Sequence, residues 1–231
     1  SVFAADMDND GDMDIVSASF NDDKIAWYEN VEGGTVCGPT VGIAISDVLA
    51  DEDASNTVID LTNVFTDSDN DDAVILKTVL SNNNQSLLTT SLNGNNLTLD
   101  FLDNQNGSAT VIIQGTSNGV TVTDEFTVTV NAVNDVPSFT KGSNIAVDEN
   151  SGAYSESNWA TSISKGPDNE SSQTLTFTVS NDNPTLFSSQ PAISPDGTLS
   201  FTPAEFMQGS ATLTISLEDD GGTGNGGDDR A

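Results

Sequence analysis

Hydrophobic and polar residues alternate in short runs along most of the chain. Threonine and valine are frequent in these runs, and both suit a pleated surface that has one buried face. The runs span residues 97–102, 109–113, 120–123, 126–130, 175–179, 199–201 and 211–217. No segment shows a helical period of convincing length, so the pattern predicts an all-β protein.

Asparagine–glycine and aspartate–glycine pairs separate the runs. Such pairs tolerate the positive φ angles of tight turns between strands. They occur at Asn93-Gly94, Asn106-Gly107, Asn118-Gly119 and Asp196-Gly197. Short strands joined by regularly spaced turns predict antiparallel β-sandwiches.

An internal repeat predicts two such sandwiches. The sequence Gly107-Ser-Ala-Thr110 recurs 102 residues later as Gly209-Ser-Ala-Thr212, and Asp51-Glu52 corresponds to Asp148-Glu149. We therefore expect an N-terminal segment (1–33), module 1 (34–136) and module 2 (137–231).

The end of module 2 is expected to differ from that of module 1. The offset of 102 carries Phe126, which opens the last strand run of module 1, to position 228 of 231. Module 2 should therefore lack most of its final strand and have an unpaired sheet edge. Because Ser1 already lies in a strand-like run, we interpret the chain as a piece of a longer protein.

Charge narrows the possible partners. The chain has 36 acidic and 5 basic residues, no histidine and a formal net charge of -31. This charge would repel nucleic acid and anionic membrane surfaces, and it favours cations. Of the acids 27 are aspartate, beside 24 asparagines, and these short oxygen-bearing side chains suit calcium. The single cysteine, Cys37, allows no internal disulfide, and no apolar run approaches the roughly 18 residues that span a bilayer.

The densest acidic motif lies near the N-terminus. It reads Asp6-Met-Asp8-Asn-Asp10-Gly-Asp12-Met-Asp14. Carboxylates at positions 1, 3, 5 and 9, a glycine at position 6 and the backbone carbonyl of Asp12 predict an oxygen cage for calcium. With the strand runs 13–20 and 24–28, the motif resembles an FG-GAP/VCBS-type β-propeller repeat, whose loop binds calcium. The resemblance covers residues 1–32 and implies a hairpin from a partial blade.

Residues 35–231 resemble the cadherin-like repeats of large bacterial surface proteins. The resemblance rests on segments 166–173, 193–203 and 217–222 and on the linker Val133-Asn-Asp-Val-Pro137. It implies two tandem antiparallel Greek-key β-sandwiches, with Ca²⁺ at their junction stiffening them into a rod. The calcium ligands that it implies are Glu52, Asp67, Asp69, Asn134, Asp135, Glu149, Asp168, Glu170, Asp219 and Asp220. The linker is shorter than the D-x-N-D-N-x-P of vertebrate cadherins, which leaves the number of junction ions open.

Catalysis is not expected. The sequence has no histidine and no P-loop, and an aromatic content of 6% leaves little for a glycosidase cleft. Our first hypothesis is a calcium-binding structural and adhesive segment of a secreted or cell-surface bacterial protein. The alternative is a polysaccharide-binding accessory module, for which Tyr154 and Trp159 are the candidate aromatic platform in module 2. Calcium-dependent association between like modules is a third possibility.

Overall fold

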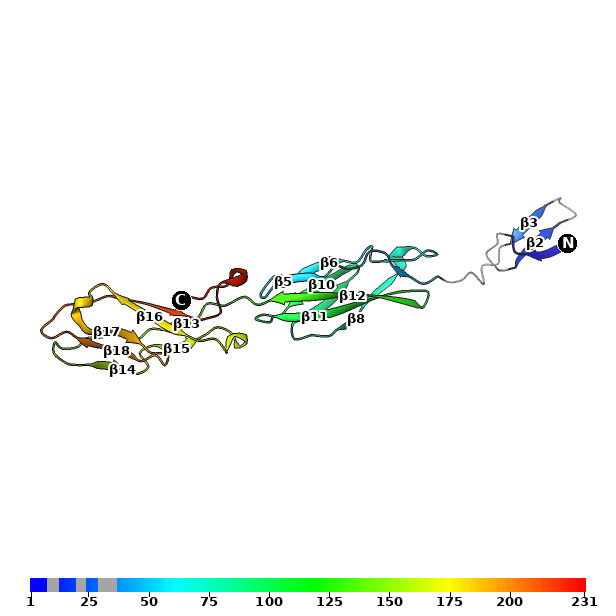
Figure 1. Cartoon of the computed structure of the whole chain (residues 1–231). Coiled ribbons are helices and arrows are strands. Elements are labelled where there is room, and N and C mark those ends of the chain that lie inside the picture. The colour runs from blue at the N-terminus through cyan, green and yellow to red at the C-terminus, as the bar shows by residue number, and fades with distance from the viewer. Residues whose placement is uncertain (8–12, 20–23, 29–36) are drawn as a thin grey trace.

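The computed structural model describes residues 1–7, 13–19, 24–28 and 37–231 (Figure 1). In this part of the chain the regular structure is β-strand, with four short 3-10 turns of three residues each. The all-β prediction is therefore confirmed. None of the helical turns in the described ranges is long and apolar enough to cross a membrane.

The N-terminal segment forms a small antiparallel sheet. Its strands are β1 (Val2–Ala5), β2 (Asp14–Ala18) and β3 (Ile25–Tyr28), with β2 in the centre. The sheet has one strand more than the expected hairpin, because residues 2–5 pair along β2. Three short strands bury little apolar surface, and Phe3, Trp27 and Tyr28 are exposed.

Module 1 consists of two facing sheets and a short strand pair. The sheets have the orders β5-β12-β11-β8 and β6-β10-β9, and β4 pairs with β7. The elements are β4 (Thr40–Val41), β5 (Val48–Asp51), β6 (Thr57–Asp60), β7 (Phe65–Thr66), η1 (Asp72–Val74), β8 (Leu76–Asn82), β9 (Leu88–Asn93), β10 (Asn96–Phe101), β11 (Gly107–Ser117) and β12 (Val120–Asn131).

The strand pairs described for module 1 are antiparallel except for β5 with β12, which is parallel. Residues 120–123 and 126–130, expected as separate runs, form one strand. The turn before it is tight, since Asn118 and Gly119 both have positive φ, as the sequence predicted. Buried residues of both sheets, including Leu97 and Val111, form one continuous core with Phe65 of β7.

Module 2 repeats this plan with shorter strands. Its sheets have the orders β14-β18-β17, β16-β19 and β13-β15. The elements are β13 (Ser138–Thr140), β14 (Tyr154–Glu156), β15 (Thr161–Ser164), η2 (Asp168–Glu170), β16 (Thr176–Asn181), η3 (Pro184–Leu186), β17 (Phe187–Ile193), β18 (Leu199–Pro203), β19 (Leu213–Glu218) and η4 (Gly224–Gly226). Its core is smaller and centres on Trp159, Ala160, Ile193 and Leu199.

The same pair of hydrogen bonds between two separate segments occurs in both modules. In module 1, the Asn83 side chain accepts from the Thr110 backbone N–H at 2.8 Å, and Asn83 N–H donates to Thr110 O. In module 2, Asp182 and Thr212 make the same two contacts. The two modules are therefore structural repeats, as the recurring Gly-Ser-Ala-Thr sequence predicted.

The outer edge of β19 differs from its counterpart in module 1. Within the described residues, β19 pairs along its length with β16, and on its other side with Arg230 and Ala231 alone. Module 2 therefore lacks most of the strand that corresponds to β12, as expected. The offset is wrong, however: the loop 220–228 replaces the two-residue turn at 118–119, so residue 228 precedes the paired residues and is not the counterpart of Phe126.

The two modules lie end to end, with the linker running between them (Figure 1). The loop that carries η4, drawn in red, lies beside this linker (Figure 1). The acidic ends of the two modules therefore meet at the junction.

Candidate metal site at the module junction

Glu52 connects module 1, the linker and module 2. It follows β5 and is 5% exposed. Its carboxylate accepts hydrogen bonds from the Val133 backbone N–H at 3.1 Å and from Asn106 Nδ2 at 3.1 Å. Asn169 of module 2 donates to the same carboxylate, at 3.2 Å to Oε2. A single buried carboxylate thus holds three segments together.

Asp135 and Glu170 form the centre of the junction. The Asp135 backbone N–H donates to Glu170 Oε1 at 2.8 Å. Glu170 is 5% exposed. Its second oxygen, Oε2, and Asp135 Oδ2 are both buried without a hydrogen-bond partner. Leaving a buried charged oxygen unpaired is costly, so these two atoms require a ligand or a proton.

A second part of the site is built around Asn134. Asn134 Nδ2 donates to Asp219 Oδ1 at 3.0 Å and to the Asp228 carbonyl oxygen at 2.8 Å. Gln173 Nε2 donates to Asn134 Oδ1 at 2.5 Å. Asp219 Oδ2 and Gln173 Oε1 are buried and unpaired, so four oxygen atoms of the junction lack partners. Asp219 is 9% exposed, so its unpaired oxygen is largely shielded from water.

Burial and mutual repulsion act on the protonation of these acids. Burial raises the pKa of Asp135, and the charges of Asp53 and Glu52 raise it further. Burial is also the main cause that raises the pKa of Glu170, and Asp135 and Asp219 add to it. The negative charges are therefore close enough to repel one another, and a bound cation would relieve this repulsion.

The donor set fits a hard cation. Within the described ranges no group of three or more histidine, cysteine or acidic side chains is placed to hold a metal ion, so the junction acids do not form a preassembled cage. Calcium, however, takes six to eight oxygens and accepts amide and backbone carbonyl oxygens beside carboxylates. Asp135, Glu170, Asp219 and Gln173 supply the unpaired oxygens that would hold it. The ion would contribute positive charge and a fixed link between the linker and module 2.

The raised pKa values predict how stability depends on pH without calcium. In the native chain, the pKa values of Asp135 and Glu170 lie above their ordinary values of 3.8 and 4.5, which apply to the unfolded chain. The native state therefore binds protons more readily than the unfolded state. The stabilisation of the native state by these protonated acids is fully present below about pH 4, and it is lost as pH rises through the raised pKa values. In chelator, we expect the unfolding free energy of the native chain to fall relative to that of Glu170→Gln between pH 4 and pH 7. Urea denaturation at each pH measures this, and parallel curves for the two proteins would contradict it.

Asp67 and Asp69 lie at the other end of module 1. Asp67 is 8% exposed and accepts from the Asp69 backbone N–H at 3.3 Å. Asp69 accepts from the Cys37 backbone N–H at 2.9 Å. Hydrogen bonds from Asp69 and Ser117 lower the pKa of Asp67, and its Oδ2 is buried and unpaired. This pair thus resembles the junction, with Ser117 in the position that Asp219 occupies in module 2.

Three other predicted ligands are exposed, unlike the buried acids of the junction. Asp168 is exposed at the start of η2. Asp220 is exposed and accepts from the Thr174 backbone N–H at 2.7 Å, the contact that most lowers its pKa. Glu149 is exposed and lies on a groove of module 2. The structure therefore brings Glu52, Asn134, Asp135, Glu170 and Asp219 together, and leaves these three outside.

The N-terminal acidic motif is described in part. Asp8, Asp10 and Asp12 lie outside the described residues. Asp14 is fully buried, and its Oδ2 accepts from the Met7 backbone N–H at 2.9 Å, while Asp6 is exposed. The calcium loop at 6–14 therefore stays a prediction.

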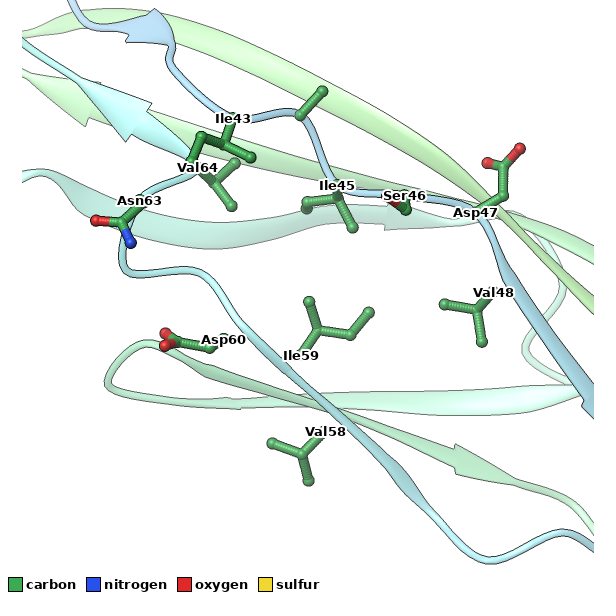
Figure 2. Close-up of a pocket in the computed structure, with 11 residues that line it drawn as sticks. Ile43, Ile45, Ser46, Asp47, Val48, Val58, Ile59, Asp60, Asn63 and Val64 are labelled. Atoms are coloured by element: carbon green, nitrogen blue, oxygen red, sulfur yellow. The ribbon is translucent and has the colours of Figure 1, made fainter.

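A shallow hollow of about 430 Å³ lies in module 1 between segment 43–48 and β6 (Figure 2). Its walls are mainly aliphatic, with the carboxylates of Asp47 and Asp60 at the rim (Figure 2). Asp47 accepts from the Thr127 backbone N–H at 2.7 Å, and Asp60 accepts from the Thr62 backbone N–H at 2.9 Å. Both acids thus cap the backbone of neighbouring segments.

Comparison with known proteins matches no family model and no curated protein. Among solved structures, the chain is similar to human protocadherin-24 EC1-2 (17% identity, 82% of this chain and 90% of that one, TM-score 0.44). It is also similar to mouse cadherin-23 EC22-24 (19% identity, 90% and 68%, TM-score 0.40). A third similar structure is an endo-fucoidan hydrolase of glycoside hydrolase family 107 (14% identity, TM-score 0.33); this match covers 96% of the chain but 32% of the hydrolase.

Proposed function

We propose that this chain is a non-catalytic, calcium-binding structural and adhesive segment of a secreted or cell-surface bacterial protein. In this proposal, calcium at the junction fixes the linker and holds modules 1 and 2 in an extended arrangement. The observation that carries it is the group of buried, unpaired oxygens on Asp135, Glu170, Asp219 and Gln173.

The physical mechanism is that ion binding stabilises one fixed arrangement of the linker and the two modules. Without a cation, the carboxylates of Glu52, Asp135, Glu170 and Asp219 repel one another across the junction. With calcium near its extracellular millimolar level, the same oxygens become ligands, and binding stabilises the arrangement in which they converge. A formal charge of -31 would oppose contacts between chains, so adhesion by like modules should also require the cation.

Polysaccharide binding has weaker support from module 2. Trp159 is 7% exposed, and its Nε1 donates to the Ser143 carbonyl oxygen at 2.9 Å. Tyr154 packs on Phe201 with ring centroids 5.0 Å apart, and its hydroxyl donates to Glu156. Trp159 is therefore buried within the module, and Tyr154 is half-buried against Phe201, so neither is a fully exposed aromatic platform.

The test is a calcium titration of the full chain. We expect calcium to raise the unfolding free energy of the chain, by about 2.7 kcal/mol when its concentration is 100 times the Kd. Differential scanning calorimetry from chelator excess to a few millimolar calcium measures this, with magnesium as the comparison ion. Small-angle X-ray scattering under the same conditions should show a narrower distribution of distances between the modules.

The matched variants are Asp135→Asn and Glu149→Gln. Each removes one negative charge, but Asp135 lies at the junction and Glu149 is exposed elsewhere. Asp135→Asn should reduce the calcium response, and Glu149→Gln should keep it. Equal melting in chelator and in calcium, or an equal response of the two variants, would contradict a junction ion.

A further inference from the structure

A groove of about 710 Å³ runs along one side of module 2. One wall is segment 143–149, and the other is segment 207–215, which includes the start of β19. Between the walls lie Trp159, Phe187, Leu199 and Phe201. The groove is therefore lined by apolar side chains at its base and by both apolar and polar residues of the two segments.

In module 1, a strand occupies the corresponding space. β12 lies between β5 and β11 and pairs with both. Its residues Phe126, Val128 and Val130 are no more than 2% exposed. The repeat places segment 145–149 where β5 and Glu52 lie, and segment 209–217 where residues 107–115 of β11 lie. The walls of the groove are thus the counterparts of the two strands that flank β12.

The last three residues of the chain pair with residues 217–219, just beyond Ile215, a residue of β19 that lines the groove. The Ala231 N–H donates to the Leu217 carbonyl oxygen at 2.9 Å, and the Leu217 N–H donates to Ala231 O at 3.1 Å. The Asp219 N–H donates to Asp229 O at 3.1 Å. Arg230 lies opposite Glu218 and forms an ion pair with it at 2.7 Å. These contacts fix an antiparallel direction that leads from Ala231 into the groove.

We propose that this groove is an acceptor site for one further β-strand, continuous with Ala231 and antiparallel to β19. Ala231 lies opposite Leu217, which corresponds to Gly115, and Gly115 lies opposite Val122 in module 1. Ala231 therefore occupies the position of Val122. The fourth, sixth and eighth residues of the added strand take the places of Phe126, Val128 and Val130, and must be apolar.

A strand on a separate chain fits less well. It would have to displace Arg230 and Ala231, which hold the edge of β19 through backbone bonds and the ion pair with Glu218. A strand joined to Ala231 extends the existing ladder and carries a smaller entropic cost of association. The site thus takes a covalently continuous strand of alternating pattern.

The experiment adds such a strand to the full chain. Residues 123–131 of module 1, Thr-Asp-Glu-Phe-Thr-Val-Thr-Val-Asn, are fused directly after Ala231. We expect the transition of module 2 to rise by about 10 °C in calorimetry, and the amide protons of β19 to exchange more slowly. Chelator is present throughout, so the result does not depend on the calcium proposal.

The control fusion contains one additional serine between Ala231 and the same nine residues. A one-residue slip turns the apolar side chains to the opposite face, so this protein should melt like the unfused chain. Equal stabilisation by both fusions, or none by either, would overturn the proposal. A rise produced by the free nine-residue peptide but not by the fusion would assign the groove to a separate chain, and would also overturn it.

Discussion

Replacing Glu170 by glutamine is expected to remove the calcium response of the junction. Glu170 contributes a buried, unpaired Oε2 to the site, while its Oε1 accepts from the Asp135 N–H. Glutamine keeps the shape and the ability to accept that bond, but it lacks the negative charge. Loss of a second-shell partner already costs 10- to 100-fold in metal affinity, so we expect loss of this carboxylate to cost on the order of 100-fold. Isothermal titration calorimetry with calcium measures the change.

The charge-matched control is Glu125→Gln. Glu125 is exposed on β12 of module 1, so its loss changes the net charge by the same amount away from the junction. Glu125→Gln should bind calcium as the native chain does. If both variants lose the same affinity, the response comes from the overall charge and not from the junction.

A second large effect is expected from Gly166→Ala, which changes no charge. Gly166 has φ of +125°, and a Cβ at this position would collide with Glu170 Oε2. The methyl group would therefore displace the unpaired oxygen and strain the backbone, at about 1–3 kcal/mol for the strain alone. Calcium affinity should fall as strongly as in Glu170→Gln, and the unfolding free energy in chelator should also fall.

The control for backbone strain is Gly152→Ala. Gly152 also has a positive φ, at +79°, but a Cβ there would meet nothing within 4 Å. This variant should lose stability in chelator and keep the native calcium affinity. Native calcium binding by Gly166→Ala would show that Glu170 Oε2 is not a ligand.

The strands could be predicted from sequence where alternation was uninterrupted. β10, β11 and β18 lie where the runs placed them. β12 was expected as two runs because Asp124 and Glu125 interrupt the apolar pattern. The strand continues through them because Asp124 accepts from the Ile45 backbone N–H at 2.7 Å, a contact between residues 79 positions apart. β17 was missed, since its sequence Phe-Ser-Ser-Gln-Pro-Ala-Ile shows no alternation.

The acidic residues of the junction could be predicted from sequence, but most of its amide residues could not. Its carboxylates stood out as pairs in turns, and the resemblance to cadherin-like repeats implied Glu52, Asp135, Glu170 and Asp219. The amides Asn106, Asn169 and Gln173 were missed, although each donates a hydrogen bond at the junction. In a chain with 24 asparagines, a single amide carries no signal, and tertiary contacts alone distinguish these three.

The long loop at 220–228 determines how a pulling force would travel through the chain. It replaces the two-residue turn of module 1, and the Asn225 side chain donates to the Ala132 carbonyl oxygen at 3.0 Å. The Asp228 N–H donates to the Asn134 carbonyl oxygen at 3.1 Å, and Asp228 directly precedes the residues that pair with β19. A pulling force on the linker would therefore act on β13 through the covalent chain and on β19 through the hydrogen bonds of this loop. Two strands of module 2 would resist this force together before either strand separated from its sheet.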